Sequence, residues 1–296
     1  MLSKSEIEAI LYVDLGLRSL PGAVVADVVG AESLTGGMAH DVWRLTLADG
    51  SHLVLKGSPR APATLFPFEA EGLRVLAEPG GLQVPRVIEV SERHLLMESL
   101  EADLPGTDAY WEAAGRAVAA LHSVRGGRFG WESDGWLGLL PQENGWMGDG
   151  HGFFAERRIL RYLREPKVCQ ALDAADVAGL ESICARLPEL VPPAPAVLNH
   201  GDLWHGNMVA SVGGEPAFID PAVCWLWAES DLSMLYCTAP PPERFLGAYQ
   251  EISPLADGWR ERMPLLHLRE HLSVLAHFGA VGNHVAEIRA VIRAFS

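Results

Sequence analysis

The first hundred residues alternate apolar and polar positions in short runs, which is the pattern of half-buried β-strands. The expected strands share this alternation and cover residues 23–34, 41–47, 52–56, 87–90 and 95–98. Ala48-Asp49-Gly50 is typical of a plain hairpin turn between the second and third strands. Residues 3–17 and 67–77 instead repeat apolar positions at helical spacing. This region is therefore predicted to form a mostly antiparallel sheet crossed by one helix.

The remainder of the chain has apolar positions at helical spacing almost throughout. The expected helices cover residues 109–124, 153–163, 177–187, 265–278 and 281–294. One β insertion is expected among them, a short hairpin over residues 208–219. The pattern predicts an α+β chain in two lobes. A small, antiparallel β lobe spans residues 1–100 and a larger, mainly helical lobe spans residues 101–296.

Composition narrows the range of partners. The 296 residues are 49% hydrophobic and 21% charged, which is ordinary for a globular protein. A net charge of −15 argues against nucleic acids and anionic membranes, because both favour basic surfaces. The chain begins without an apolar signal segment and has no run of about 18 apolar residues. We expect a soluble cytoplasmic protein, monomeric, with a small-molecule partner.

Cysteine spacing gives no sign of a metal site. Cys169, Cys184, Cys224 and Cys237 are widely separated and form no Cys-x-x-Cys pair. Buried free thiols are therefore favoured over disulfides or zinc ligands.

The chemistry is concentrated in His200-Gly201-Asp202-Leu203-Trp204-His205-Gly206-Asn207 and the later Ile219-Asp220-Pro221. An Asp, an Asn five positions on and a second Asp thirteen beyond that match the catalytic half of a kinase. In that chemistry Asp202 accepts the proton of the attacking hydroxyl, while Asn207 and Asp220 hold Mg²⁺ against the phosphates of ATP. The expected hairpin would return the chain so that Asp220 lies beside the other two residues.

Lys56 ends an apolar strand, as does the kinase lysine that contacts the α- and β-phosphates. A solvated lysine at a strand end is the plainer interpretation, but the downstream motif favours the ATP role. A kinase lysine is oriented by a helix glutamate, and Glu69 and Glu71 are both candidates. They lie about 200° apart around a helix, so only one can face Lys56.

The motif Asp202-Leu203-Trp204 through Asn207, with Asp220-Pro221-Ala222-Val223 soon after, resembles the fructosamine (ketosamine) kinase family. That family is a branch of the aminoglycoside and choline phosphotransferase group, which has a two-lobed protein-kinase-like fold. Further similar stretches are found at residues 68–71, 140–146, 153–159 and 229–234, and the likeness runs from about residue 35 to about residue 279. The resemblance implies MgATP-dependent phosphorylation of a sugar hydroxyl on a ketosamine. It also selects Glu71 as the partner of Lys56.

Two stretches are candidates for holding the nucleotide. Gly36 and Gly37 lie between the first two strands, where glycines would let backbone N–H groups approach phosphate oxygens. A simple hairpin turn is the alternative. The stretch containing Met97, Glu98 and Leu100 is expected to be the hinge, where backbone groups would bond the edge of adenine.

Other residues around the motif have two interpretations each. His200 could be a base, but a role in supporting the loop is favoured. Asp231 could cap a helix or bond the N–H groups of the catalytic loop, and the two roles are compatible. Trp204 and Trp225 are candidate substrate contacts, because an indole face suits a sugar ring. His205 is a third candidate, because it fills a position that varies in the motif.

The stretch after Asp220 departs from the family pattern. Cys224-Trp225-Leu226-Trp227-Ala228-Glu229 stands where Tyr-Tyr-Gly-His-Arg-Glu is usual, and this puts the acceptor in question. One alternative is a kinase for another amino-sugar, an aminoglycoside, a choline-like compound or a sugar alcohol. Acidic residues around Asp202 would favour an aminoglycoside. The other alternative, an inactive nucleotide sensor, is disfavoured because Lys56, Asp202 and Asp220 are all present.

Overall fold

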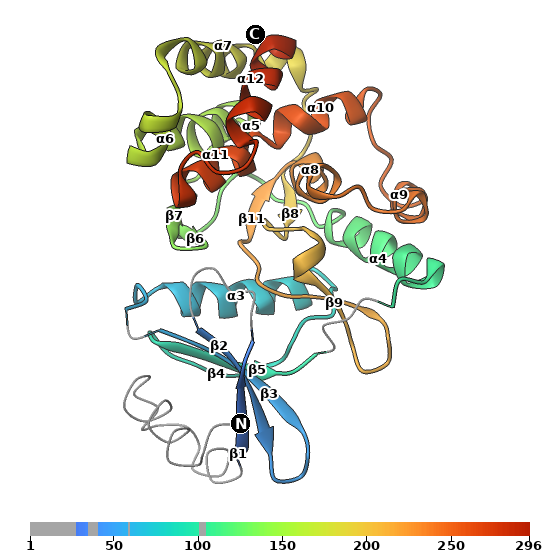
Figure 1. Cartoon of the computed structure of the whole chain (residues 1–296). Helices are drawn as coiled ribbons and strands as arrows, with labels where there is room; N and C mark the ends of the chain where they lie inside the picture. Colours follow the sequence, from blue (N-terminus) through green and yellow to red (C-terminus); the bar gives the residue numbers. More distant parts are fainter. Residues whose placement is uncertain (1–27, 35–40, 59, 101–104) are drawn as a thin grey trace.

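The computed structural model of the chain describes residues 28–34, 41–58, 60–100 and 105–296 (Figure 1). The helix expected over residues 3–17, the beginning of the first expected strand and the loop with Gly36 and Gly37 lie outside the described residues.

A five-stranded antiparallel sheet forms the N-terminal part of the described structure, as the alternation predicted. Its strands are β1 (Val28–Ser33), β2 (Asp41–Leu47), β3 (His52–Gly57), β4 (Val87–Val90) and β5 (His94–Glu98). The strand order is β1-β2-β3-β5-β4, and every neighbouring pair is antiparallel. The central strand is β3, its last three residues are buried, and Lys56 among them contacts Asp220 of the helical part.

Helix α3 (Leu65–Ala77) lies between the sheet and the helical part (Figure 1). One side of the helix, with Phe66 and Leu73, packs with apolar residues of β5. Phe68 and Leu76 instead join the core of the helical part. The helix begins two residues earlier than expected. Since both of its sides are buried, its position ties the sheet to the rest of the chain.

The C-terminal part is mainly helical and holds the largest apolar core of the described structure. Its helices are α4 (Asp108–Leu121), α5 (Gly150–Phe153), a π-helix (Phe154–Ile159), a 3₁₀ segment (Leu160–Arg164), α6 (Pro166–Ala171), α7 (Ala174–Leu190), α8 (Ala228–Thr238), α9 (Glu243–Gln250), α10 (Trp259–Leu266), α11 (Leu268–Phe278) and α12 (His284–Phe295). Among the residues that the structure describes, no helix combines the length and apolar character needed to cross a bilayer. Cys184 and Cys224 are buried free thiols, as expected, whereas the free thiol Cys169 is exposed.

Two of the expected helices are interrupted. Residues 153–163 pass from α5 into the π-helix and then the 3₁₀ segment, and residues 265–278 are divided between α10 and α11 at His267. The π-helix carries the buried Arg158, whose guanidinium donates to the backbone oxygen of Glu143 and to Oδ1 of Asn144, each at 2.7 Å. Apolar spacing identifies the buried side of such a segment, but it does not reveal a local change in hydrogen-bond register.

Three two-stranded sheets lie in the described helical part, so the expectation of a single β insertion was wrong. The pairs are β6 (Gly135–Leu137) with β7 (Leu140–Gln142), β8 (Val197–Asn199) with β11 (Cys224–Leu226), and β9 (Met208–Ala210) with β10 (Pro216–Phe218). The last pair is the hairpin predicted from the motif. A strand of three residues is too short to show a clear alternation, which explains why the others were missed.

A group of three histidines packs where α10, α11 and α12 meet. The rings of His267 and His271 have centroids 4.7 Å apart, and Nδ1 of His271 lies 3.0 Å from Nδ1 of His284. Burial, followed by the charges of Arg269 and His284, lowers the pKa of His267 to about 4. Burial and the two neighbouring histidines lower the pKa of His271 to about 3. Both rings are therefore neutral in the folded protein near pH 7.

We expect this group to make the folded protein sensitive to acid. An unfolded histidine takes up a proton near its ordinary pKa of 6.5. The contribution of these neutral histidines to the free energy of unfolding is therefore complete above pH 6.5. It is lost as the pH falls towards the lowered pKa values of the folded protein. Between pH 7 and pH 5 the free energy of unfolding should fall by about 1–2 kcal/mol more in the wild type than in His271→Gln. Urea unfolding at both pH values measures this, with the exposed His52→Gln as the control. An equal pH slope in the wild type and His271→Gln contradicts the prediction.

Candidate active site

Lys56 is the charged group most deeply placed at the junction of the sheet and the helical part. It lies near the end of β3 and is only 4% exposed. Its Nζ donates to Oε1 of Glu69 at 2.6 Å and to Oδ1 of Asp220. Burial by itself would lower the pKa of Lys56, but the charges of Asp220 and Glu69 raise it above the usual value. The side chain is therefore held as an ammonium, the form that can bind phosphate oxygens.

The partner of Lys56 is Glu69, and the prediction of Glu71 was wrong. Phe66, Glu69 and Leu73 are spaced three and four residues apart, so they share the side of α3 that faces the sheet. Glu71 lies about 200° from Glu69 around the helix and remains partly exposed. The apolar pattern of α3 is the signal in the sequence that selects Glu69, whereas the resemblance to the family favours Glu71.

This geometry predicts different effects for the two glutamates. Glu69→Gln removes the charge that orients the ammonium, so kcat/KM for ATP should fall by about 10- to 100-fold. Glu71→Gln makes the same chemical change two residues away and should stay within about twofold of the wild type. Steady-state kinetics with varied ATP compares the two variants. A larger loss in Glu71→Gln than in Glu69→Gln would restore the original assignment.

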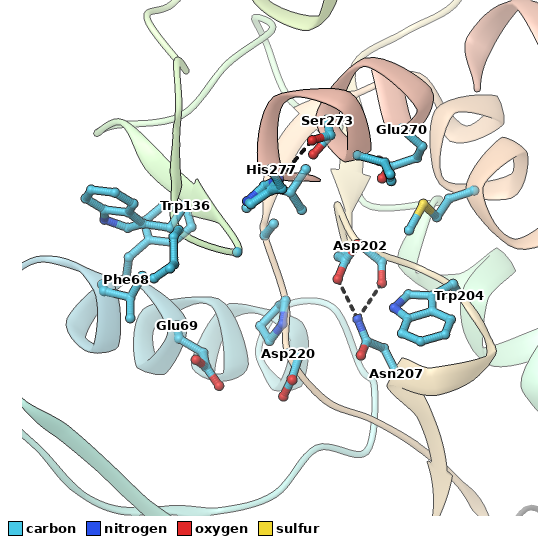
Figure 2. A pocket seen from close by; sticks show the side chains of 18 of the residues that line it. Phe68, Glu69, Trp136, Asp202, Trp204, Asn207, Asp220, Glu270, Ser273 and His277 are labelled. Carbon is cyan, nitrogen blue, oxygen red and sulfur yellow. Dashed lines mark hydrogen bonds between the residues drawn. The ribbon is translucent and has the colours of Figure 1, made fainter. Parts of the chain in front are cut away.

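The catalytic loop connects β8 to β9 and carries Asp202 and Asn207. The side-chain amide nitrogen of Asn207 donates to the backbone oxygen of Asp202 at 2.8 Å and to Oδ2 of Asp202 at 2.7 Å (Figure 2). The backbone oxygen of Asn207 in turn accepts from the N–H of Ile219 at 3.0 Å, which fixes the segment leading to Asp220. The motif thus brings Asp202, Asn207 and Asp220 to one cavity.

The environment of Asp202 suits a group that exchanges protons. Burial, followed by the negative charge of Glu270, raises the pKa of Asp202 to about 8. Arg269 and the hydrogen bond from Asn207 act in the opposite direction. A carboxylate with a pKa near the operating pH can accept a proton from a hydroxyl and later release it.

Asp231, in the first turn of α8, anchors the start of the catalytic loop. Its carboxylate accepts the backbone N–H groups of His200 at 2.6 Å and Gly201 at 2.8 Å, and it lies 3.2 Å from Nε2 of His122. Trp227 is the N-cap of α8, so the loop role of Asp231 holds and the capping role does not. His200 is fully buried, its pKa is lowered by burial, and its Nδ1 accepts from the N–H of Asp202 at 3.3 Å. This placement agrees with support of the loop.

Gly201 leaves space that a side chain would fill. Its φ is +83°, and a Cβ atom at this position would lie 1.8 Å from the backbone oxygen of Ala222. The backbone N–H of Ala222 donates to the oxygen of His200 at 2.9 Å. The catalytic loop and the Asp220 segment can approach this closely only because residue 201 is glycine.

Loss of the Asp231 charge should release the loop. Asp231→Asn replaces an ionised acceptor of two backbone N–H groups in a buried site, and we expect about 2–4 kcal/mol of destabilisation with a matching loss of turnover. The free energy of unfolding in urea and kcat are the two measurements. Asp108→Asn, an exposed change of the same kind, is the control. A stable and fully active Asp231→Asn protein would disprove the anchoring role.

Beyond the motif, the cavity has walls that the sequence did not predict. One side of α11 faces it with residues at helical spacing, and the β6–β7 turn and α3 close the opposite side (Figure 2). The lining residues outside the motif are Leu65, Phe68, Trp136, Leu137, Gly138, Leu139, Met234, Glu270, Ser273, Val274, His277 and Phe278. Spacings of three, four and seven residues from Glu270 were visible in the sequence, but they could equally indicate a core helix.

The candidate substrate contacts are only partly brought together. Trp204 lines the cavity, whereas His205 and Trp225 do not. The His205 ring packs near Trp111, with centroids 5.6 Å apart, and Trp225 stacks on Trp131 at 6.0 Å. These two side chains pack against other aromatic rings and do not face the cavity.

The expected hinge comprises the end of β5 and the residues directly after it. Met97 is buried in a small apolar cluster, and the N–H of Glu98 donates to the oxygen of Arg86 at 3.0 Å. Leu100 directly precedes residues 101–104, which lie outside the described residues. Binding of adenine by Met97, Glu98 and Leu100 therefore stays a prediction.

The donor set fits a magnesium ion. Asn207 donates its side-chain amide nitrogen to Asp202, so its Oδ1 can serve as a metal ligand. Asp220 contributes a carboxylate to the same cavity from the segment after the hairpin. Oxygen atoms are the ligands that Mg²⁺ prefers, and it commonly uses one or two carboxylates together with substrate phosphates. Among the described residues, no cluster of three or more His, Cys, Asp or Glu side chains is placed to hold a metal ion.

An ammonium on a central strand, its helix glutamate and the Asp-Asn-Asp set define a phosphotransferase of the protein-kinase-like fold. The solved structure of an aminoglycoside phosphotransferase superposes with a TM-score of 0.61 over 92% of this chain and 95% of that one, at 14% identity. At that identity the likeness is one of fold.

The sequence model of the fructosamine kinase family matches residues 22–295, and the chain belongs to this family. A probable ketoamine kinase of Klebsiella aerogenes is 34% identical, over 88% of this chain and 90% of that protein. The crystal structure of a provisional fructosamine-3-kinase from Thermobifida fusca superposes with a TM-score of 0.82, at 35% identity over 92% of this chain and 96% of that one. The family consists of phosphotransferases that act on sugar hydroxyls, and a kinase of this family uses ATP.

Proposed function

We propose that this protein transfers the γ-phosphoryl group of MgATP to a sugar hydroxyl of a ketosamine. The observation that carries the proposal is the shared cavity. The Lys56 ammonium, paired with Glu69 and Asp220, opens onto the same space as Asp202 and Asn207. This shared lining supports a transferring phosphoryl group that lies between a phosphate-binding cation and a base.

Each residue has one role in the proposed reaction. Lys56 binds phosphate oxygens, and Glu69 keeps its ammonium directed at them. Asp202 accepts the proton of the acceptor hydroxyl while the oxygen forms a bond to the γ-phosphorus. The bond from that phosphorus to the β–γ bridging oxygen breaks, and ADP leaves with the electron pair. Asn207 and Asp220 would hold Mg²⁺, which supplies positive charge next to the phosphates.

The acidic residues of the cavity bear on the alternatives. Glu69, Asp202 and Asp220 belong to the phosphoryl-transfer set, and Glu270 is the one further carboxylate that lines the described cavity. A polycationic aminoglycoside would be expected to meet several additional carboxylates. A single additional carboxylate supports an acceptor that carries a single positive charge. The full catalytic set also weighs against an inactive nucleotide sensor.

The decisive variant is Asp202→Asn, which keeps the size of the side chain but removes its charge and most of its basicity. Loss of a general base typically costs ~10²–10⁴-fold. We expect kcat to fall by about that much, with MgATP affinity close to that of the wild type. Calorimetric titration of MgATP and product formation from a fructosyl-lysine-type acceptor measure the two effects on one preparation.

Asp220→Ala is the matched comparison, and it should weaken both MgATP binding and turnover. Omission of Mg²⁺ should reduce ATP affinity in the wild type and have less effect in Asp220→Ala. Wild-type turnover by Asp202→Asn would overturn the assignment of the base. Tight MgATP binding by a wild type that phosphorylates none of a panel of ketosamines, aminoglycosides, choline and free sugars would favour the sensor.

A further inference from the structure

The side of α11 that faces the cavity carries one charged residue. Glu270, Ser273, Val274 and His277 are spaced three, four and seven residues along the helix, so they line the same wall. Glu270 is 9% exposed and lies beside Asp202 in the view of the cavity (Figure 2). Glu270 is on the side of the cavity that carries Asp202, and the ion pair of Lys56 with Glu69 is on the opposite side. The Asp202 side is where the acceptor, rather than the nucleotide, would bind.

Glu270 is held in place from behind. Its Oε1 lies 2.6 Å from Nη1 of Arg269, and Nη2 of Arg269 donates to Oε1 of Gln142 at 2.8 Å. Arg269 is itself buried and does not line the cavity. The arginine therefore fixes the position of the carboxylate from one side, while the glutamate is the member of the pair that faces the acceptor.

The two carboxylates at this end of the cavity repel each other. Both carboxylates line the same cavity, and Glu270 lies beside Asp202 (Figure 2). A positively charged group bound between them would interact favourably with both, because opposite charges in a partly buried site attract strongly. A neutral acceptor would lack this attraction between opposite charges. The arrangement therefore discriminates between acceptors by charge.

Apart from Ser273 and His277, the side chains that line the acceptor end and its mouth are mainly apolar. Trp204 and Trp136 present indole rings to the cavity, and such rings also attract a cation. At the mouth, Leu139 of the β6–β7 turn is 48% exposed and Phe278 at the end of α11 is 43% exposed. Exposed apolar side chains at the entrance of a cavity favour a ligand with an apolar part that emerges there.

We propose that Glu270 binds the charged amine of the acceptor and that the substituent on this amine is apolar, lying between Leu139 and Phe278. This rests on the proposed kinase function and narrows its substrate class to ketosamines of small apolar amines. In a ketosamine the amine nitrogen is attached to the first sugar carbon, so the amine and the reacting hydroxyl lie on the same short segment. The two neighbouring carboxylates match these two groups, because Glu270 would bind the amine while Asp202 accepts the proton of the hydroxyl.

The experiment compares two acceptors of equal shape: N-benzyl fructosamine and its ether analogue, in which oxygen replaces the amine. Wild-type kcat/KM should be at least about tenfold higher for the amine, since a charge-assisted contact is lost in the ether. In Glu270→Gln the preference should fall to about twofold or less. Glu270→Asp should retain it, and the exposed Glu261→Gln controls for the change in net charge. MgATP affinity and Tm of each variant are measured alongside.

The outcomes separate this inference from the proposed function. If the wild type phosphorylates both acceptors equally, or Glu270→Gln keeps the amine preference, the inference fails and the kinase function stands. If the wild type phosphorylates no acceptor, the proposed function itself fails. Should Glu270→Gln not fold, competition in the wild type decides. Benzylammonium should inhibit at least about tenfold more strongly than benzyl alcohol, and equal inhibition overturns the role of Glu270.

A second pair of acceptors tests the apolar substituent on the amine. Fructosyl-lysine and N-benzyl fructosamine carry the same sugar and the same type of amine, but they differ in the polarity of the substituent. The benzyl acceptor should have the higher kcat/KM, and Leu139→Ser should reduce that advantage. A higher kcat/KM for fructosyl-lysine, unchanged in Leu139→Ser, would remove the apolar substituent from the proposal and leave the role of Glu270 intact.

Discussion

A buried ammonium cannot be left without negative partners, and this requirement organises the centre of the molecule. Lys56 comes from the central strand of the sheet, Glu69 from α3, and Asp220 from a segment 164 residues away along the chain. The close packing of α3 on that segment is visible at Gly72, where a Cβ atom would lie 2.9 Å from Cγ of Pro221. The strand, the helix and the catalytic hairpin can therefore adopt their positions only together.

The parts of the structure that the sequence predicted well are those specified by nearby residues. The antiparallel sheet follows from alternation within single strands, and the β9–β10 hairpin follows from its turn residues and from the spacing of Asn207 and Asp220. The anchoring of the catalytic loop by Asp231 was one of two open interpretations, and the structure selects it. Local sequence was sufficient in these cases because each element is formed by one short stretch of chain.

The parts that were missed depend on contacts between distant stretches. Glu69 rather than Glu71 faces Lys56 because the apolar side of α3 is directed at the sheet, which a motif comparison does not take into account. Trp225 resembles a substrate contact by residue type, yet Trp131 covers it from another part of the chain. The wall formed by α11 could not be predicted for the same reason. Its residues acquire a role only when the helix is packed beside Asp202.

The separation of α11 from the phosphate-binding side has an evolutionary consequence. Glu270, Ser273 and His277 contribute neither to the Lys56 pair nor to the backbone anchors of the catalytic loop in the described part of the chain. Substitutions at Ser273 and His277 could therefore accumulate without loss of phosphoryl transfer, whereas a change at Glu270 would also alter the charge beside Asp202. Descendants of a common ancestor could in this way diverge in the metabolite they modify while inheriting an unaltered reaction.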